Sequence, residues 1–211
     1  MHRMMIAAGA FALYAAAQVA FAAEERTREA GPPPEGLKVA TFAAGCFWCV
    51  EPPFDKLDGV VSTTSGYTQG HLAGATYKEV SAGTTGHTEA VQVVYDPNKV
   101  TYETLLQVFW RNVDPLEATG QFCDKGDMYR PGIYTHDGEQ KRLAEASKAA
   151  LSASGRFKEP IVVEIRDAAP FWIAEDGHQD FYLKNPIRYR YYRFACGRDA
   201  RLEELWGKPS S

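Results

Sequence analysis

The stretch that decides the fold is VATFAAGCFWC, residues 39–49. Its first part is a short apolar run, which predicts a buried strand over residues 38–44. Gly45 then marks a turn, and the amphipathic segment that follows predicts a helix over residues 47–57. The stretch therefore places Cys46 at a strand-to-helix turn, beside two large aromatic side chains.

The thiol of Cys46 is a candidate nucleophile. A cysteine in the first turn of a helix lies near unpaired backbone N–H groups and the positive end of the helix dipole, and both favour the reactive thiolate. Phe47 and Trp48 would wall the sulfur with apolar surface. Such a pocket suits a substrate that is apolar at one end and polar where it reacts.

The N-terminal region has the pattern of an exported protein. His2 and Arg3 precede an apolar stretch, and Ala20–Ala22 has an A-x-A-like pattern, so residues 1–22 predict a secretory signal peptide. The apolar stretch is shorter than the roughly 20 residues of a membrane-spanning helix, so an uncleaved membrane anchor is the less favoured alternative. We therefore expect an exported protein that resides in the periplasm.

Two further segments complete the chain. Residues 23–36 are charged and then proline-rich, which predicts a flexible linker. Residues 37–211 have the length of a single domain. The chain is 45% hydrophobic and 12% aromatic, enough for a real core, and its net charge of −4 offers no general attraction for nucleic acid or anionic lipid. We therefore expect no nucleic-acid partner, and function has to come from a site.

Hydrophobic periodicity indicates a mixture of strands and helices. Beyond the opening strand and helix, it predicts strands over 60–66, Tyr77–Ser81, Glu89–Tyr95 and Ile161–Ile165, and helices over 101–112 and Asp137–Ser154. The aromatic and basic segment Ile187–Phe194 is interpreted as a sheet strand with solvated arginines rather than a nucleic-acid face. This mixture predicts an α/β (α+β) fold, a two-layer sandwich in which helices pack on a mixed β-sheet, with a ferredoxin-like core.

Four blocks of sequence resemble, in the same order, those of type A peptide methionine sulfoxide reductases. They are Gly45–Trp48, Gly86–Val91, Asp124–Gly126 with Tyr129-Arg130, and Asp176 with His178–Asp180. The resemblance spans about Val39 to Trp206. It implies that residues 37–211 form a catalytic domain for thiol-dependent reduction of the S epimer of methionine sulfoxide, free or in oxidised proteins. It also implies that no metal or bound organic cofactor is needed.

The resemblance also implies roles for individual residues. Cys46 matches the nucleophile that attacks the sulfoxide sulfur and becomes a sulfenic acid as methionine departs. Glu89 matches the acid that gives its proton to the sulfoxide oxygen, and an apolar setting would raise its pKa. The matched substrate pocket has aromatic walls for the methyl group and polar groups for the oxygen, namely Phe47, Trp48, Tyr77, Asp124 and Tyr129.

The other three cysteines are candidates to resolve the sulfenic acid. Cys196 is favoured, because many relatives keep a resolving cysteine on a mobile segment near the C-terminus. Cys49 shares a helix face with Cys46, which makes a bond between them geometrically possible. Cys123 can attack the sulfenic acid itself or relay the disulfide outward, and in an exported protein some cysteines pair simply as structural disulfides. A thioredoxin-like protein is the implied reductant, and we expect a monomer.

Two other classes of function stay open at this point. A thiol-disulfide oxidoreductase that uses Cys46 and Cys49 predicts activity on disulfides and indifference to Glu89. An exported binding domain held by two disulfides predicts no sulfenic acid at Cys46. A zinc site is disfavoured, because Cys123 and Cys196 stand alone, without a second Cys-x-x-Cys or paired histidines at ligand spacing.

Overall fold

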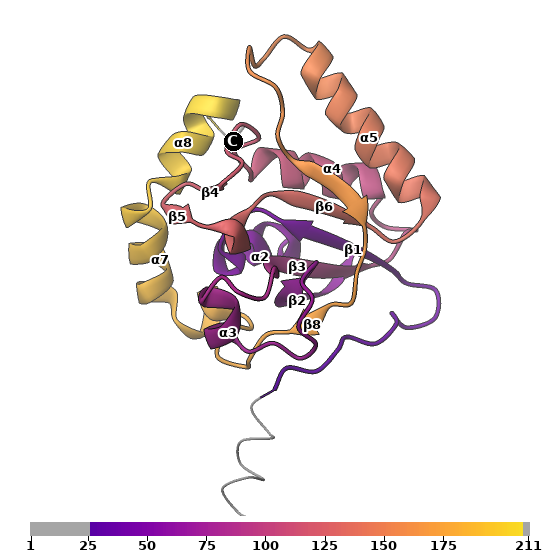
Figure 1. Ribbon diagram of the computed structural model, residues 1–211. Helices are drawn as coiled ribbons and strands as arrows, with labels where there is room; N and C mark the ends of the chain where they lie inside the picture. Colours follow the sequence, from indigo (N-terminus) through magenta and orange to yellow (C-terminus); the bar gives the residue numbers. More distant parts are fainter. Residues whose placement is uncertain (1–25, 209–211) are drawn as a thin grey trace, which may run out of the picture.

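Figure 1 shows the computed structural model, which describes residues 26–208. In this part of the chain the strands of the main sheet run in the order β7-β6-β1-β3-β2-β8. All neighbours in the sheet are antiparallel except β6 and β7, which are parallel. The strands are β1 (Lys38–Ala43), β2 (Val60–Thr68), β3 (Thr88–Tyr95), β6 (Gly132–Thr135), β7 (Glu164–Asp167) and β8 (Trp172–Ile173). The predicted signal peptide lies outside the described residues.

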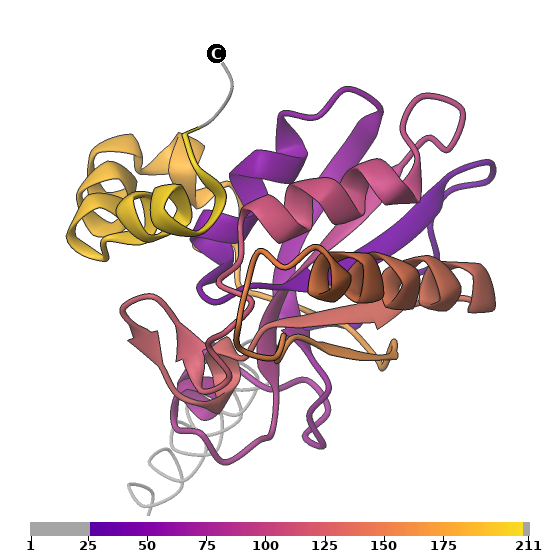
Figure 2. The same ribbon diagram turned by 90° about the horizontal axis from the view of Figure 1, so that it is seen from above.

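Helices cover one face of this sheet, as Figure 2 shows for α4 and α5, which lie side by side. A second group, α7 and α8, lies at the margin of the sheet next to the small hairpin of β4 and β5. The helices are α2 (Phe47–Asp55), α3 (Tyr77–Ser81), α4 (Tyr102–Arg111), α5 (Gly138–Ala153), α6 (Phe181–Lys184), α7 (Pro186–Ala195) and α8 (Arg198–Trp206). The hairpin strands are β4 (Gly120–Gln121) and β5 (Asp124–Lys125), and η1 (Asp127–Tyr129) is a short 3-10 helix.

The core lies between the sheet and helices α2 and α4. Phe42 of β1 is fully buried and stacks on Phe54 of α2 with ring centroids 4.9 Å apart. The same ring lies 5.3 Å from Phe109 and 6.1 Å from Tyr102, both on α4. Burying aromatic side chains is among the largest single contributions to a core. The predicted two-layer arrangement, a mixed sheet packed with helices, is confirmed.

The turn between β1 and α2 requires glycine. Gly45 has φ +83°, a left-handed conformation that other residues rarely adopt, and a Cβ there would lie 2.6 Å from Cβ of Gln121. After this turn α2 begins at Phe47, with Cys46 as its capping residue. The strand, turn and helix predicted from residues 39–49 are confirmed.

Two predicted strands are helices in the structure. Tyr77–Ser81 forms α3, because Thr76 and Glu79 make a capping box in which each side chain accepts a hydrogen bond from the other's backbone N–H. The segment Ile187–Phe194 belongs to α7, which starts with Pro186 at its first turn, a favoured helix position for proline. Both predictions gave more weight to local alternation than to these start signals.

The strand predicted over Ile161–Ile165 begins three residues later, as β7 at Glu164. The backbone before it is engaged elsewhere, since Val162 donates its N–H to the carbonyl of Pro115 and the Val163 carbonyl accepts from Lys148 Nζ. These contacts replace the ladder hydrogen bonds of a strand, and the prediction was wrong there.

Part of the predicted linker contacts the sheet edge. Arg28 accepts a backbone hydrogen bond from Ile173, and Ala30 donates one to the carbonyl of Phe171, each 2.8 Å long. Glu29 forms a bridge with Trp172 of β8. These contacts cover the open side of β8. Among residues 26–208, no helix has both the length and the apolar character to cross a membrane.

Candidate active site

The sheet brings Cys46 and Glu89 together, because β1 and β3 are neighbours. Cys46 follows the end of β1, and Glu89 is the second residue of β3. The backbone N–H of Phe47 donates a 3.0 Å hydrogen bond to Oε2 of Glu89. Cys46 is 7% exposed and Glu89 is 1% exposed. The first N–H of α2 therefore orients a buried carboxyl group beside the thiol.

Burial controls the protonation of both groups. It raises the pKa of Glu89 to about 8, against the hydrogen bond from Phe47, so the carboxyl group is largely protonated at neutral pH. Burial and then the charge of Glu89 raise the pKa of the Cys46 thiol well above its ordinary value, against a hydrogen bond with the Tyr192 hydroxyl. Desolvation of the buried sulfur therefore disfavours the thiolate that was expected from the helix end.

Tyr192 and Asp124 lie together beside Cys46. The Tyr192 hydroxyl donates a 2.6 Å hydrogen bond to Oδ2 of Asp124 and is also within hydrogen-bonding reach of Cys46. Burial raises the pKa of Asp124, while Tyr192 and the nearby Arg198 and Lys125 favour its carboxylate form. Asp124 is thus placed at the site as predicted, and it is held there by a helix from the far end of the chain.

Three aromatic side chains of the predicted pocket lie around His178. The Phe47 ring lies 5.1 Å from the His178 ring, and the Tyr77 ring lies 4.6 Å from it. Trp48 donates a 3.1 Å hydrogen bond from Nε1 to His178 Nδ1 and stacks on Phe181 with centroids 3.6 Å apart. His178 therefore orients three of the predicted pocket residues.

The two predicted tyrosines lie on the Glu89 side of the site. Burial, followed by the charge of Glu89, raises the pKa of both Tyr77 and Tyr129, so both hydroxyls are protonated donors. The two hydroxyls are within hydrogen-bonding reach of each other. Glu175, which the sequence analysis did not single out, fixes this region by accepting from the backbone of Tyr77 at 2.7 Å and from the Tyr67 hydroxyl at 2.8 Å.

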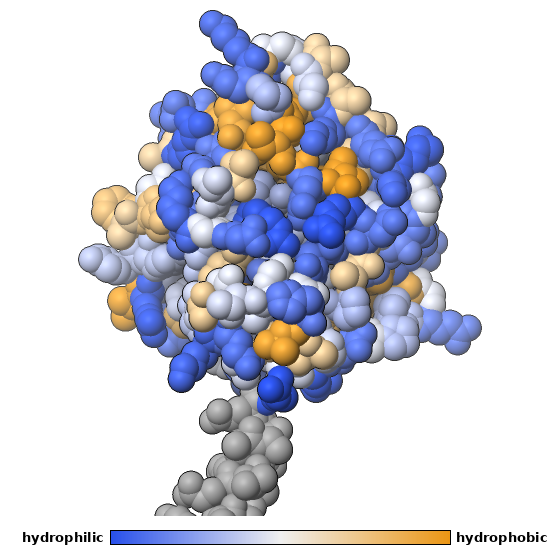
Figure 3. Space-filling view, viewed as in Figure 1, coloured by the Kyte–Doolittle hydropathy of each residue, from blue (hydrophilic) through white to orange (hydrophobic). Residues whose placement is uncertain are grey.

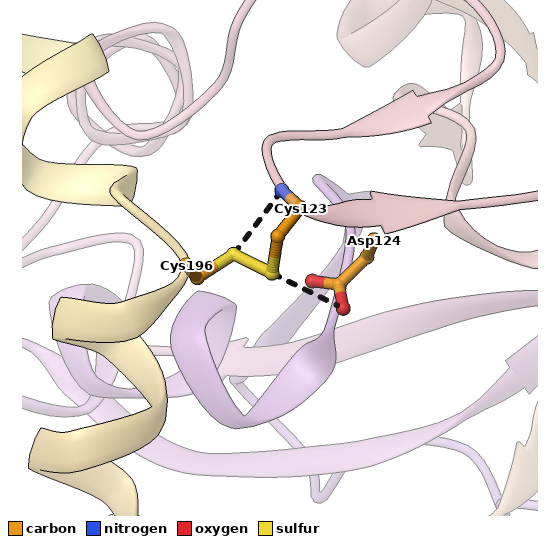
Figure 4. Close-up of side chains that lie close together, drawn as sticks. All are labelled: Cys123, Asp124 and Cys196. Atoms are coloured by element: carbon orange, nitrogen blue, oxygen red, sulfur yellow. Dashed lines mark hydrogen bonds between the residues drawn. A yellow bond between two sulfur atoms is a disulfide. The ribbon is translucent and has the colours of Figure 1, made fainter.

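The cysteines form two different pairs. Cys123 and Cys196 are joined by a disulfide with Cα atoms 5.0 Å apart (Figure 4), whereas Cys46 and Cys49 are free and buried. The bond ties the turn between β4 and β5 to the residue after α7. Cys196 was the favoured partner for Cys46, and in this structure its bond is to Cys123.

The site offers little for a metal ion. Within residues 26–208, Cys123, Asp124 and Cys196 place potential ligand atoms within 4.8 Å of one another. The thiolate is the form of cysteine that binds metals, and both of these sulfurs are consumed by the disulfide. The donor set therefore does not fit a metal in this redox state.

Residues 38–210 match the family model described as peptide methionine sulfoxide reductase. This chain belongs to that family. It is similar to peptide methionine sulfoxide reductase A of Listeria monocytogenes, with 55% identity over 172 residues that cover 82% of this chain and 97% of the relative. The resemblance inferred from the four sequence blocks is confirmed, and the thiol-disulfide oxidoreductase alternative is not favoured.

Solved structures agree with this family membership. The fold is similar to methionine sulfoxide reductase A of Corynebacterium diphtheriae, with a TM-score of 0.65 and 32% identity over 74% of this chain and 84% of that one. It is also similar to the reduced form of Mxr1 from Saccharomyces cerevisiae, with a TM-score of 0.67 and 31% identity over 74% of this chain and 90% of that one.

Besides Glu175, sequence reasoning missed two residues of this reductase site. Tyr192 escaped notice because its segment was interpreted as a strand, and the helix start at Pro186 was the signal that places it on α7. Arg198 is 1% exposed and donates from Nη2 to the carbonyls of Ala44 and Asn112, at 3.1 and 2.7 Å. It holds the start of α8 against the Gly45 turn, and a lone arginine in a sequence gives no sign of such burial.

Proposed function

We propose that this chain is a peptide-methionine (S)-S-oxide reductase with Cys46 as the nucleophile and Glu89 as the acid. The observation that carries the proposal is the buried pair itself, a thiol beside a carboxyl group whose pKa is raised to about 8. Reduction of a sulfoxide needs a nucleophile for sulfur and a proton donor for oxygen. This pair supplies both at neutral pH.

Different pocket residues contact the methyl group and the oxygen of the substrate. The methyl group of the sulfoxide lies against Phe47 and Trp48, and the oxygen points towards Glu89 and the tyrosine hydroxyls of Tyr77 and Tyr129. As Cys46 Sγ attacks the sulfoxide sulfur, Glu89 gives its proton to the oxygen and the thiol proton replaces it. Methionine departs and Cys46 is left as a sulfenic acid, so one oxygen atom and its oxidising equivalents pass to the enzyme. Only one epimer of the sulfoxide can place its methyl group on the aromatic side and its oxygen on the polar side at the same time.

Recycling proceeds through Cys196 and then Cys123. The Cys196 thiol attacks the sulfenic sulfur and water leaves, giving a Cys46–Cys196 disulfide. The Cys123 thiol then attacks Cys196 and releases Cys46. The redox state of the structure supports this route, since Cys46 is free and Cys123–Cys196 is bonded. Cys49 is 1% exposed, so a disulfide to it would be hard for a protein reductant to reach.

Partner, location and assembly follow as parts of the same proposal. A thioredoxin-like protein reduces the Cys123–Cys196 disulfide, and the substrates are methionine sulfoxides that are free or exposed in oxidised proteins. Residues 1–22 act as a cleaved signal peptide and residues 23–36 as a linker, which places the catalytic domain in the periplasm as a monomer. The charged and apolar pattern of the N-terminal region supports the export route.

The deciding experiment offers resolved S and R epimers of methionine sulfoxide to the purified chain with dithiothreitol, beside Cys46→Ser. Turnover of the S epimer alone, abolished by the substitution, is the expected result. Reduction of neither epimer, with disulfide exchange intact, would instead assign the chain to the thiol-disulfide oxidoreductases.

A further inference from the structure

The two sulfurs of the Cys123–Cys196 disulfide have different surroundings, as Figure 4 shows. Cys123 is exposed in the turn between β4 and β5, and Cys196 is half-buried behind it after the end of α7. Thiol-disulfide exchange depends on which sulfur is accessible and on which sulfur leaves more easily as a thiolate. Both properties differ between the two ends of this bond.

The surroundings of Cys196 stabilise a negative charge on its sulfur. Its Sγ accepts a hydrogen bond from the backbone N–H of Cys123, with N and S 3.2 Å apart. A hydrogen bond to a charged acceptor is stronger than one to a neutral acceptor, so this N–H stabilises Cys196 more as a thiolate than as a disulfide sulfur.

The surroundings of Cys123 disfavour a negative charge on its sulfur. Its Sγ lies 3.8 Å from Oδ1 of Asp124, whose other oxygen accepts from the Tyr192 hydroxyl. A carboxylate oxygen of Asp124 also lies within 4.8 Å of Cys196 Sγ, but only that sulfur accepts the N–H of Cys123, which offsets the negative charge. Burial raises the pKa of Asp124, while the hydrogen bond from Tyr192 and the charges of Arg198 and Lys125 oppose that shift and favour the carboxylate. A carboxylate beside a sulfur disfavours the thiolate and accepts a hydrogen bond from the neutral thiol, so Cys123 is retained as a thiol after reduction.

We infer that the Cys123–Cys196 disulfide is polarised, so that a protein dithiol attacks Sγ of Cys123 and Cys196 leaves as the thiolate. A bond forms between the donor sulfur and Cys123, the Cys123–Cys196 bond breaks, and its electron pair stays on Cys196. The second donor thiol then attacks the donor sulfur of this mixed disulfide and releases Cys123, which takes up a proton. The donor dithiol becomes a disulfide, and the cysteine pair gains two electrons.

Attack at Cys123 releases the thiolate on Cys196, which is the cysteine on the Cys46 side of the bond. Cys196 lies four residues after Tyr192, which is about 6 Å of rise along a helix, and the Tyr192 hydroxyl reaches Cys46. Cys196 is also the cysteine that resolves the sulfenic acid in the proposed function, on which this part of the inference rests. Attack at the other sulfur would leave the donor attached to Cys196 until the second donor thiol released it, and Cys196 could not act during that time.

The test traps the first step with the full chain. A Cys46→Ser/Cys49→Ser double variant keeps Cys123–Cys196 as its reactive pair, and the probe is a thioredoxin whose second active-site cysteine is serine, so that the mixed disulfide persists. After acid quenching and alkylation, mass spectrometry identifies the cysteine that carries thioredoxin. We expect the adduct on Cys123 and alkylation on Cys196, in at least about a tenfold excess over the reverse. An adduct on Cys196, an even mixture, or no adduct where dithiothreitol reduces the pair would overturn the inference.

A second variant separates polarity from simple access. Added to the double variant, Asp124→Asn removes the negative charge and leaves Cys123 as exposed as before, so the excess of adduct on Cys123 should shrink by several-fold. An unchanged ratio would refute the role of the carboxylate. Because these variants carry no Cys46 nucleophile, their outcome is independent of sulfoxide reduction. Failure of the proposed function would appear instead as no methionine formed by the fully reduced native chain.

Discussion

The two cysteine pairs of this protein differ in every respect that governs thiol chemistry. Cys46 and Cys49 lie within one helical turn, buried and reduced, where a thiol can meet a small substrate away from water. Cys123 and Cys196 are 73 residues apart, bonded to each other, and accessible at the margin of the fold. The comparison teaches that the two pairs differ in access, and in the proposed function the buried pair meets the sulfoxide and the accessible pair meets the protein reductant.

Electrostatics sharpens this contrast. The buried thiol of Cys46 faces Glu89, a carboxyl group that burial keeps protonated, with its pKa raised to about 8. The exposed disulfide faces Asp124, whose carboxylate form Arg198 and Lys125 favour. In the proposed mechanism, Glu89 gives a proton and Asp124 carries the charge that orders the exchange of sulfurs.

The surface around the second pair is suited to contact with other molecules. Figure 3 shows a face that is largely hydrophilic with scattered apolar patches. Helix α7, which ends next to Cys196, carries three large side chains in solvent: Ile187 and Phe194, each 83% exposed, and Tyr191, 73% exposed. No comparable exposure surrounds Cys46, which is 7% exposed.

The largest expected effect comes from removing the nucleophile of the buried pair. Cys46→Ser should lower turnover of the S sulfoxide by at least about a thousandfold, because the serine hydroxyl is a far weaker nucleophile for sulfur. The measurement is methionine formed per enzyme with dithiothreitol as reductant. Cys123→Ser is the matched control, and it should keep most of the dithiothreitol-supported rate. Equal losses in both variants would show that the pairs do not divide the work.

Removal of the buried acid comes next. Glu89→Gln should slow sulfoxide reduction by about a hundredfold or more, the usual scale of general acid catalysis, while Cys46 remains open to alkylation. Because Glu89 holds its proton up to a pH of about 8, the native rate should fall as pH rises through about 8, and the variant should lose this limb. A pH profile of kcat/KM tests both points. Full activity of the variant across the profile would contradict the acid role.

Variants of the exposed pair should affect turnover that depends on a protein reductant. Cys196→Ser and Cys123→Ser should each lower thioredoxin-supported turnover by about tenfold or more, yet allow one turnover of the reduced enzyme without any donor. The measurement compares steady-state rates with a burst of one methionine per enzyme. Cys49→Ser is the control and should recycle normally. The reverse pattern would make Cys49 the resolving residue.

Stability should depend on the exposed pair alone. A disulfide between residues 73 apart restricts the unfolded chain, so Cys123→Ser or Cys196→Ser should lower the free energy of unfolding by about 2–4 kcal/mol. Urea unfolding of the oxidised native chain and the variants measures the difference. Cys49→Ser, which breaks no bond, serves as the reference. A disulfide variant as stable as the native chain would indicate that the bond acts in redox chemistry without bracing the fold.

The smallest effect concerns a second buried acid on the helix of Cys46. Glu51 is fully buried, its Oε2 has no hydrogen-bond partner in the structure, and burial raises its pKa from 4.5 to about 7. The folded state therefore holds this proton more tightly than the unfolded state. Its contribution to stability is lost as pH rises from about 4.5 to about 7 and is not regained above that range.

Glu51→Gln should remove this loss and stabilise the protein at pH 8 by up to about 3 kcal/mol, with little gain at pH 4. Urea unfolding at both pH values measures the change. The descending limb of activity assigned to Glu89 should persist in this variant. If Glu51→Gln removed that limb as well, the pH dependence would not belong to Glu89.

The sequence alone determined the local chemistry of this protein. The apolar run before Gly45 and the amphipathic segment after it placed Cys46 at the start of a helix. The ordered blocks of sequence pointed to Glu89, Asp124 and Tyr129, and the family resemblance they carry pointed to Tyr77. The local fold was predicted correctly because strand, turn and helix signals are short-range, and the family was recognised because its pattern records contacts that spacing cannot reveal.

Only the tertiary structure decided how distant segments complete the site. It put Tyr192 of α7 beside Cys46, buried Arg198 beneath the Gly45 turn, and paired Cys123 with Cys196. Each of these depends on where a helix from the C-terminal part docks on the sheet. The protonation of Cys46 was decided in the same way, since desolvation of the folded site outweighs the helix end, and burial is a property of the whole chain.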